Sequence, residues 1–541
     1  MNTNKTTQVR TSNRSVRLPA VLSVLAAATL VFSGCSSSKG SGQSGDAGAG
    51  EPEPSAIEVG EYFVHPTDVV VDGLVGQRIA SSTGIAARWA YLPGEQPFNE
   101  YVAEQVAPHF ENQAASRNAA YFPEAHDPSP EWLERGCIAG STNLSGREIL
   151  DDPALSGGVG ADTVLAVACD SVLASGSNYA EKIRFVRGNS TEVVSDLVEI
   201  VYTNTETGEV AKGRELISEQ GVQDLYDATY EAVGVERPMS GDEVLAPTAE
   251  DLDDFHSSLS NVGVDADGDT YVTVDQNEIA ILAAGDSNVE IAPLTLVIPA
   301  DRAHLNLTDL GQEISRSMAA GEEWSGPAAV PAGQQFVDCD LSPCLAVTYD
   351  DGPSYLTPSV LDAYAELPYA ALTFFVLGGS IGGQEEILAR AHNEGHEIGN
   401  HSWSHPAFTT LDDAAITQEL TQTSDAIAAA TGEAPVLYRP PYGDLNDRTL
   451  AAAGMPSVLW SLDTNDWQHP GQEALVADVV TNSQPDDIVL MHDIHEDTVG
   501  VAGQIGEQLV ERGFTLVTVS QLIRGLEVGP VMLTSAGEFR S

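Results

Sequence analysis

From residue 345 onward, short apolar runs alternate with amphipathic stretches in a regular order. The apolar runs predict strands at residues 345–349, 372–377, 396–399, 457–462, 488–491 and 515–519. The stretches with helical spacing predict helices at 358–365, 385–393, 412–430, 475–482 and 503–512. This alternation predicts parallel strands joined by helical crossovers, so a distorted, incomplete (β/α) barrel and an open α/β sheet both fit.

The first half of the chain has a mixed pattern. Residues 192–202 predict a strand, residues 205–209 a hairpin turn, and residues 222–233 a helix. Shorter runs at 270–274, 278–283 and 289–298 predict further strands. We therefore expect an α+β region over residues 57–317, which could form two subdomains.

Segments of low complexity divide the chain. Residues 36–56 are mostly Gly, Ser, Ala, Glu and Pro, a composition that cannot bury a core, and they predict a flexible linker. Residues 318–336, rich in Ala, Gly, Pro and Glu, predict a second linker. The α/β pattern then occupies residues 337–525 and leaves 526–541 as a C-terminal tail.

The N-terminus has the pattern of an export signal. Basic residues at 5, 10, 14 and 17 precede an apolar stretch, residues 18–32, that is short for a membrane span. Ser33 and Gly34 then precede Cys35. Residues 1–35 resemble a bacterial lipoprotein signal with Cys35 as the lipidated residue, although Phe32 stands where Leu is usual. This predicts an extracytoplasmic, lipid-anchored protein. The alternative is an ordinary secretory signal that is cleaved nearby, which would give a secreted protein.

Charge and cysteine usage agree with export. The chain has 80 acidic residues against 24 Lys and Arg, a formal net charge of -56. Such a charge argues against nucleic acid as a partner and favours a solvated acidic surface. Besides Cys35 there are four cysteines, which allow three disulfide pairings. Their order along the chain favours Cys137–Cys169 and Cys339–Cys344 over a structural zinc site.

Two adjacent carboxylates follow the first strand of the α/β pattern. Asp350 and Asp351 lie between this apolar run and Gly352-Pro353. That order predicts a buried strand ending in a tight turn, at the sheet edge where α/β folds build their sites. On its own, the pair could equally be a structural turn.

A pair of histidines supplies candidate metal ligands. His401 and His405 lie four residues apart in His-Ser-Trp-Ser-His, so they could share one side of a helical turn. Two imidazoles and one carboxylate form a metal site that leaves positions for water and substrate. Surface histidines are the alternative reading of the pair taken alone.

Three later segments add polar groups. In Arg439-Pro440-Pro441-Tyr442-Gly443, the prolines stiffen the loop and leave the Tyr442 N–H as the next free donor. Arg439 is the type of residue that pairs with a carboxylate. Asp463-Thr464-Asn465-Asp466-Trp467 supplies acid and an aromatic wall, and His492 ends a predicted strand. A carboxylate beside His492 would raise its pKa and favour a protonated general acid.

Together these five motifs, in this order, resemble the polysaccharide deacetylase family, carbohydrate esterase family four, which carries the NodB homology domain. The resemblance covers about residues 337–525, and Tyr349 in place of the usual Phe is the one departure. It implies a distorted (β/α) barrel and metal-dependent hydrolysis of acetyl groups on a polysaccharide.

The resemblance also implies a role for each matched residue. Asp351, His401 and His405 would bind a divalent metal, with zinc expected and cobalt or a similar ion possible. Asp350 would be the general base, held by Arg439, and His492 the general acid, tuned by Asp463. The Tyr442 amide would stabilise the oxyanion. Substrate contacts would come from Tyr442, Trp467 and Pro441.

Three functions remain open from the sequence. The first is removal of N-acetyl groups from peptidoglycan N-acetylglucosamine or N-acetylmuramic acid, which a membrane anchor facing the wall favours. The second is chitin deacetylation or O-acetyl esterase activity on xylan-like polymers. The third is a non-catalytic surface lipoprotein that binds glycan or senses envelope stress. Residues 201–217 and 271–299 weakly resemble the extracytoplasmic region of RsiV-type anti-sigma-factor proteins, which implies a non-catalytic N-terminal half.

Overall fold

The computed structural model describes residues 54–235, 237, 239–240, 243–283, 289–367, 369–524 and 532–535. The predicted signal peptide with Cys35, most of the first predicted linker and most of the C-terminal tail lie outside these residues. Residues 54–541 form one compact unit. No helix among the described residues is both long enough and apolar enough to cross a membrane.

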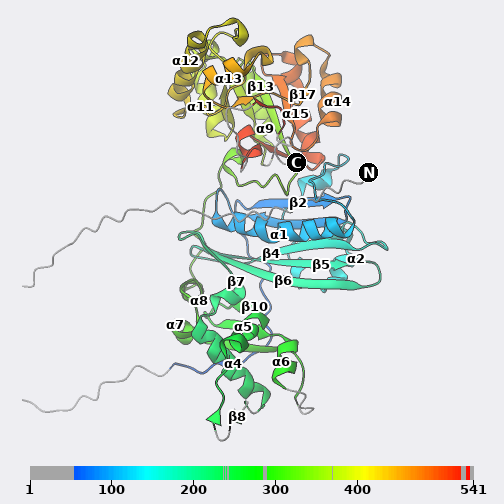
Figure 1. Ribbon diagram of the computed structural model, residues 1–541, viewed down its shortest axis with the longest axis vertical. Helices are drawn as coiled ribbons and strands as arrows, with labels where there is room; N and C mark the ends of the chain where they lie inside the picture. The colour runs from blue at the N-terminus through cyan, green and yellow to red at the C-terminus, as the bar shows by residue number, and fades with distance from the viewer. Residues whose placement is uncertain are drawn as a thin grey trace, which may run out of the picture. The chain divides into compact units, whose positions relative to one another are not determined.

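A parallel sheet organises the C-terminal part of the chain (Figure 1). Its strands follow the order β15-β14-β13-β18-β17, and β19 pairs with the first half of β13. Bridges from Asn400 to Tyr438 and from Tyr438 to Ser457 continue the parallel pairing from β15 to β16. The strands are β13 (Cys344–Asp350), β14 (Thr373–Val376), β15 (Glu397–Asn400), β16 (Ser457–Val458), β17 (Leu462–Asp463), β18 (Ile488–His492) and β19 (Thr515–Val517). This is the predicted distorted (β/α) barrel.

Helices cover the outside of this sheet. They are α9 (Thr357–Ala365), α10 (Gly378–Ile381), α11 (Glu385–Asn393), α12 (Asp413–Thr431), α13 (Asp447–Ala453), α14 (Gln472–Asn482), α15 (Glu496–Glu511) and α16 (Val519–Leu522). Leu345, Val347 and Tyr349 of β13 pack against α9 and α15 side chains in one buried cluster. Every residue of β13 is buried, and its first four residues, 344–347, form the apolar run expected of a strand covered on both faces.

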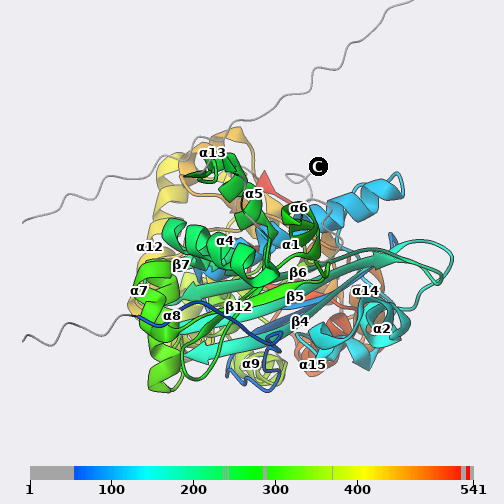
Figure 2. The ribbon, with the colours of Figure 1, turned by 90° about the horizontal axis from the view of Figure 1, so that it is seen from below.

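The N-terminal part contains two further sheets, as an α+β region should. A six-stranded sheet has the order β2-β3-β4-β5-β6-β7, in which β3 and β4 are parallel and the other neighbours antiparallel. Its strands are β2 (Val75–Ser81), β3 (Ile85–Tyr91), β4 (Val164–Ser175), β5 (Asn178–Gly188), β6 (Val193–Asn204) and β7 (Glu209–Lys212). Figure 2 shows β4, β5 and β6 side by side. Helix α1 (Pro97–Ser116) packs on this sheet through Phe98 and Phe110.

The second N-terminal sheet is smaller and antiparallel. Its order is β1 (Glu58–Val59), β12 (Leu294–Ile298), β11 (Thr270–Val274) and β10 (Leu259–Val264). The helices of this region are α2 (Gly146–Asp151), α3 (Pro153–Ser156), α4 (Glu219–Val233), α5 (Ala249–Ser258), α6 (Gln276–Leu282), α7 (Ala303–Asn306) and α8 (Asp309–Ala320). Strand β8 (Met239–Ser240) pairs antiparallel with β9 (Glu243–Val244).

The strand predicted at residues 278–283 is wrong. This stretch lies in α6, whose first N–H groups are capped by Asp275: its side chain accepts a hydrogen bond from the Asn277 N–H. The buried residues Ile279 and Leu282 are three apart, which fits one face of a helix.

Both predicted disulfides are present. Cys137 pairs with Cys169 on β4, and Cys339 pairs with Cys344 at the start of β13. The second bond closes a loop directly before the strand that carries Asp350, so it ties that strand to the segment entering it.

Candidate functional site: a metal triad at the carboxyl edge of the barrel

The carboxyl ends of three parallel strands bring the candidate residues together. Asp350 ends β13 and is aligned with His492 at the end of β18. On the other side, β14 lies between β13 and β15, and His401 directly follows β15. In α/β barrels this edge is where sites form, because loops from several strands converge there.

Asp351 and the two histidines form a cluster that could hold a metal ion. One ligand atom from each of Asp351, His401 and His405 lies within 4.8 Å of the others. Asp351 Oδ1 is 3.6 Å from His401 Nε2 and 3.4 Å from His405 Nε2. This buried oxygen has no hydrogen-bond partner among the described residues. An orphaned carboxylate oxygen facing two imidazole nitrogens fits a divalent cation, so these residues suit a metal.

The segment from His401 to His405 is a loop, and the helical turn predicted for it is wrong. Ser402 has φ of 72° and His405 has φ of 61°, in the left-handed region that side chains disfavour. Glu419 of α12 holds this loop: its carboxylate accepts hydrogen bonds from the N–H groups of Trp403 and Ser404, both at 2.8 Å. The two imidazoles therefore converge through a strained loop rather than through helical spacing.

His401 is fixed as a neutral ligand. Its Nδ1 lies 2.7 Å from the carbonyl oxygen of Arg439, which selects the tautomer with hydrogen on Nδ1. Burial lowers the pKa of His401 to about 3, so the ring is uncharged at neutral pH. Its Nε2 then carries an unprotonated lone pair on the side of Asp351 Oδ1, 3.6 Å away, where a cation could accept electron pairs from both atoms.

Asp350 has different surroundings from its neighbour. Its Oδ1 accepts a hydrogen bond of 2.7 Å from Nη1 of Arg439, and its Oδ2 lies 3.6 Å from His401 Nε2. Burial raises the pKa of Asp350, and the Arg439 guanidinium opposes that rise. Arg439 is itself fully buried and also donates to Thr348 Oγ1 and to the carbonyl oxygens of Val458 and Leu459. Of the two adjacent carboxylates, Asp350 thus binds a guanidinium, whereas Asp351 lies near two imidazoles.

The carboxylate partner of His492 is Asp466. The sequence-based prediction of Asp463 as this partner is wrong. Nδ1 of His492 lies 2.7 Å from Oδ1 of Asp466. Asp463 ends β17, and its side chain instead accepts the N–H of Asn465. Asn465 is left-handed, with φ of 51°, and this turn carries Asp466 back toward β18. The tuning residue therefore lies three positions later than predicted.

The Asp466 contact governs the protonation of His492. Burial alone would lower the pKa of His492, but the hydrogen bond and charge of Asp466, with the charges of Asp350 and Asp351, raise it to about 9. Asp466 is buried and also accepts hydrogen bonds from the His492 N–H and from Thr498 Oγ1. With this pKa, His492 is a protonated imidazolium at neutral pH, at the strand end beside Asp350.

Comparison with known proteins agrees with this geometry. The family model for polysaccharide deacetylase matches residues 338–456. A peptidoglycan-N-acetylglucosamine deacetylase of Bacillus cereus is 37% identical over 189 residues, which are 33% of this chain and 88% of that protein. The chain belongs to the polysaccharide deacetylase family.

Other relatives are longer proteins matched in part. The peptidoglycan-N-acetylmuramic acid deacetylase PdaC of Bacillus subtilis is 38% identical over 179 residues, 33% of this chain, and the chain spans only 38% of that relative's length. A solved structure of peptidoglycan deacetylase PdaC from Bacillus subtilis has 37% sequence identity and covers 34% of this chain and 92% of that one, with a TM-score of 0.33.

Of the remaining predicted residues, Tyr442 contacts a histidine of the triad. The ring of Tyr442 contacts that of His405, with centroids 4.4 Å apart, and the side chain is 70% exposed. Pro441 and Tyr442 lie in a short turn whose hydrogen bonds come from Gly443 and Asp444, and no described residue accepts the Tyr442 N–H. Trp467 is 55% exposed and follows Asp466 directly. Both aromatic side chains are thus available to a ligand.

One buried carboxyl group escaped the sequence analysis. Asp493 directly follows His492, is fully buried, and accepts a hydrogen bond from Thr357 Oγ1 at the start of α9. A Cβ atom on Gly352 would lie 2.5 Å from both Asp493 oxygens, so the glycine allows the Asp350–Pro353 turn to pack on this carboxyl. Burial raises the pKa of Asp493 to about 7. The signal in the sequence that could have identified Asp493 is its position directly after His492, at the end of a predicted strand.

An open groove of about 570 Å³ runs beside the triad. Asp351 and His405 line it together with Pro353, Ser354, Tyr355, Leu377, Ser380, Gln384 and Ile494. The N-terminal loop of α9 and helix α10 thus form its walls. This groove gives an extended ligand access to the metal ligands.

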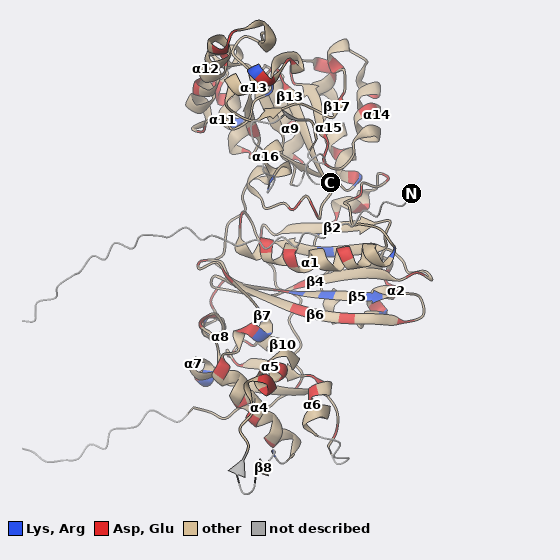
Figure 3. Ribbon diagram, viewed as in Figure 1, with Lys and Arg blue, Asp and Glu red and all other residues tan. Residues whose placement is uncertain are grey.

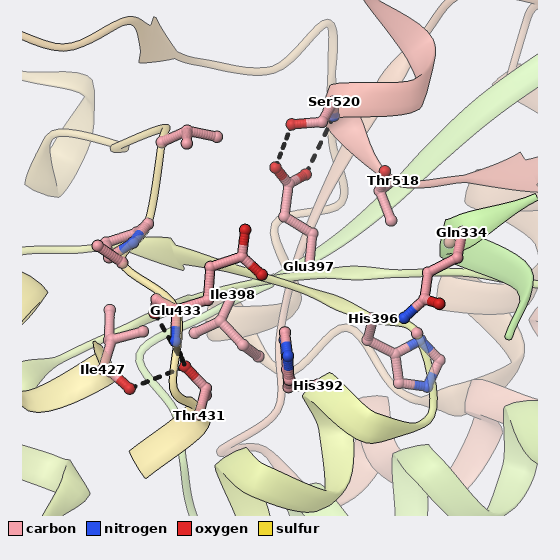
Figure 4. Close-up of a pocket in the computed structure, with 15 residues that line it drawn as sticks. Gln334, His392, His396, Glu397, Ile398, Ile427, Thr431, Glu433, Thr518 and Ser520 are labelled. Carbon is pink, nitrogen blue, oxygen red and sulfur yellow. Dashed lines mark hydrogen bonds between the residues drawn. The ribbon is translucent and has the colours of Figure 1, made fainter. Parts of the chain in front are cut away.

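A second pocket, of about 220 Å³, lies at the opposite end of β15 (Figure 4). It contains Glu397, the first residue of that strand, whereas His401 follows the last. The carboxylate of Glu397 accepts hydrogen bonds from Ser520 and from Thr373 Oγ1. Since the triad lies beyond the other end of the strand, this pocket is no part of the candidate site.

Proposed function

We propose that this chain is a metal-dependent N-deacetylase of a cell-wall glycan, acting on peptidoglycan amino sugars. The observation that carries the proposal is the pair of unlike carboxylates: Asp350 is bound to a buried guanidinium, while Asp351 faces two imidazoles. One strand end thus supplies a base and a metal ligand side by side. Peptidoglycan deacetylases among the relatives support the substrate class.

Asp351, His401 and His405 would hold the metal, and zinc is the ion that we propose. Two imidazoles and a carboxylate suit Zn²⁺, and cobalt or a similar ion fits the same donors. When bound, a divalent ion supplies Lewis-acid polarisation of the acetyl carbonyl and makes water a better nucleophile at neutral pH.

The chain's own residues would move the protons. Asp350, with its pKa raised by burial, takes a proton from the attacking water, while Arg439 keeps the carboxylate in place. The Tyr442 N–H, which no described residue accepts, can stabilise the oxyanion. His492, protonated because of Asp466, donates its proton to the leaving nitrogen so that the amine departs as acetate forms.

The location of the protein is part of the proposal. The predicted signal and Cys35 would place the catalytic region outside the cytoplasm on a lipid anchor, next to the wall. Residues 57–317 would then be a non-catalytic module between the linker after Cys35 and the second linker, ahead of a deacetylase domain at residues 337–525. Its resemblance to the RsiV-type region stays a prediction.

Acetate release tests the proposed activity. Residues 36–541 would be purified, loaded with zinc and assayed on peptidoglycan, chitin oligomers and acetylated xylan. We expect release from peptidoglycan, lost in Asp350→Asn and kept in Asp463→Asn, which makes the same chemical change at a carboxylate that binds the Asn465 N–H instead of Arg439. Release that survives Asp350→Asn contradicts the assignment of the base. No release from any substrate by the zinc-loaded protein favours a glycan-binding role instead.

A further inference from the structure

The groove beside the triad has an uncharged lining. Apart from Asp351 and His405, its walls present hydroxyl, amide and apolar side chains, such as Ser380, Gln384 and Ile494. Hydroxyl and amide groups can bind the neutral hydroxyls of a sugar. None of these lining residues can form an ion pair with an anionic substituent.

Neither a lysine nor a described arginine of the C-terminal region lines this groove. Between residues 337 and 541 the sequence contains no lysine, and its arginines are Arg390, Arg439, Arg448, Arg512, Arg524 and Arg540. The last of these lies outside the described residues. Figure 3 shows how few basic positions this part of the fold carries beside its acidic ones.

Each described arginine of this region already has partners. Arg439 binds Asp350, Arg390 binds Asp362 and Glu394, Arg448 binds Asp413, and Arg524 binds Glu95. Arg512 donates to the carbonyl oxygens of His126 and Ser483. These arginines are thus engaged elsewhere in the fold, and none of them lines the groove.

An acidic side chain contacts one wall of the groove. Tyr355, which lines the groove, has its hydroxyl 3.4 Å from Oε1 of Glu496, an exposed residue at the start of α15. A ligand carboxylate at this wall would meet a like charge and would be partly desolvated without a partner. An ammonium or a hydroxyl would meet no such penalty.

We infer that this groove selects amino sugars without a carboxylate, so that the enzyme deacetylates N-acetylglucosamine in preference to N-acetylmuramic acid. The two sugars differ by the lactyl group on O3, and O3 is on the carbon next to the one that bears the acetamide. The lactyl carboxylate must therefore lie close to the reacting group. The inference rests on the proposed deacetylase function and adds which unit of the glycan is hydrolysed.

The test compares peptide-free oligomers of alternating N-acetylglucosamine and N-acetylmuramic acid, with mass spectrometry assigning each lost acetyl group. The zinc-loaded protein, residues 36–541, should deacetylate the glucosamine units at least about tenfold faster. A sample whose lactyl carboxylates are reduced to alcohols separates charge from bulk, and in it the muramic units should become substrates. Preferential loss from unmodified muramic units, or no gain after reduction, overturns the inference. If neither sugar releases acetate, the proposed function itself is contradicted.

Charge reversal at the groove provides a second test. Glu496→Lys places a cation beside Tyr355, and the rate on muramic units relative to glucosamine units should rise several-fold. Glu507→Lys makes the same change at another exposed position of α15, about 16 Å along the helix, and should leave this ratio as in the wild type. Equal ratios in both variants and the wild type overturn the inference.

Discussion

The carboxylate of Asp466 lies 2.7 Å from Nδ1 of His492, and its second oxygen accepts the backbone N–H of the same histidine. The side chain thus fixes both the ring and the main chain of His492. Because Asp466 is buried, its charge acts on the ring with little screening by water.

Replacing Asp466 should shift the alkaline side of the pH profile. Asp466→Asn removes the charge that raises the pKa of His492 to about 9, so this pKa falls. His492 then loses its proton at lower pH, and the rate falls off at lower pH than in the wild type. The shift is measured from the pH dependence of kcat in the wild type and the variant. Both proteins are loaded with metal, so the bound cation affects the two profiles equally.

Asp463→Asn is the matched control for this shift. It makes the same chemical change three residues away, at a side chain that contacts the Asn465 N–H. We expect its alkaline limb to coincide with that of the wild type. A downward shift in Asp463→Asn and none in Asp466→Asn would contradict the assignment of the partner.

The two adjacent aspartates should separate in a metal-binding experiment. Asp351→Asn removes the anionic ligand that faces both imidazoles, so zinc affinity should fall by at least about tenfold, the effect typical of even outer-shell partners of a metal site. Asp350→Asn should retain zinc and lose acetate release. Isothermal titration with zinc, followed by metal analysis after dialysis, checks both variants.

His396→Ala serves as a control for loss of a buried histidine. His396 lies at the other end of β15 and lines the second pocket. The zinc affinity of the His396→Ala variant should match that of the wild type. Equal affinities in Asp351→Asn and the wild type would show that this carboxylate is no ligand.

Arg439 should stabilise the fold through Asp350. Arg439→Met leaves a buried carboxylate without its cation, which should cost about 3–5 kcal/mol of the free energy of unfolding. Asp350→Asn removes that carboxylate, so the double variant should recover part of the loss. Denaturant unfolding of the two single variants and the double variant gives the coupling. Additive losses would mean that the pair is not coupled.

The two disulfides should differ in their contribution to stability. The Cys137–Cys169 bond links residues 32 apart, and the Cys339–Cys344 bond links residues 5 apart. Loop-closure entropy assigns them about 3.7 and about 2 kcal/mol. Thermal unfolding of Cys137→Ser/Cys169→Ser should therefore show the larger fall in Tm, compared with Cys339→Ser/Cys344→Ser. The reverse order would contradict the entropic account.

Periodicity predicted the barrel well, because its strands are buried on both faces and its helices are amphipathic. The helix at residues 385–393 was predicted to the residue. The prediction for residues 278–283 was wrong because Ile279 and Ile281 alternate as in a strand. The N-cap residue that starts the helix, Asp275, lies before this apolar stretch and was not considered with it. Local hydrogen bonding at the end of the segment decided its structure.

Within the site, motif order predicted which residues meet but not how. Asp351, Ser402, His405, Tyr442 and Asn465 all have positive φ, although none is glycine. Asp, His and Asn adopt such angles more often than other side chains do, but residue type does not say at which positions the surrounding fold imposes them. The left-handed Asn465 is the reason that Asp466 rather than Asp463 reaches His492.

Arg439 contacts the candidate base with its side chain and a candidate metal ligand with its main chain. A shift of its loop would carry Asp350 and His401 in the same direction, so the distance between base and metal would change little. Side-chain substitutions there would leave the carbonyl in place. Substitution of this side chain should therefore change the basicity of Asp350 while the main-chain contact that orients His401 is kept.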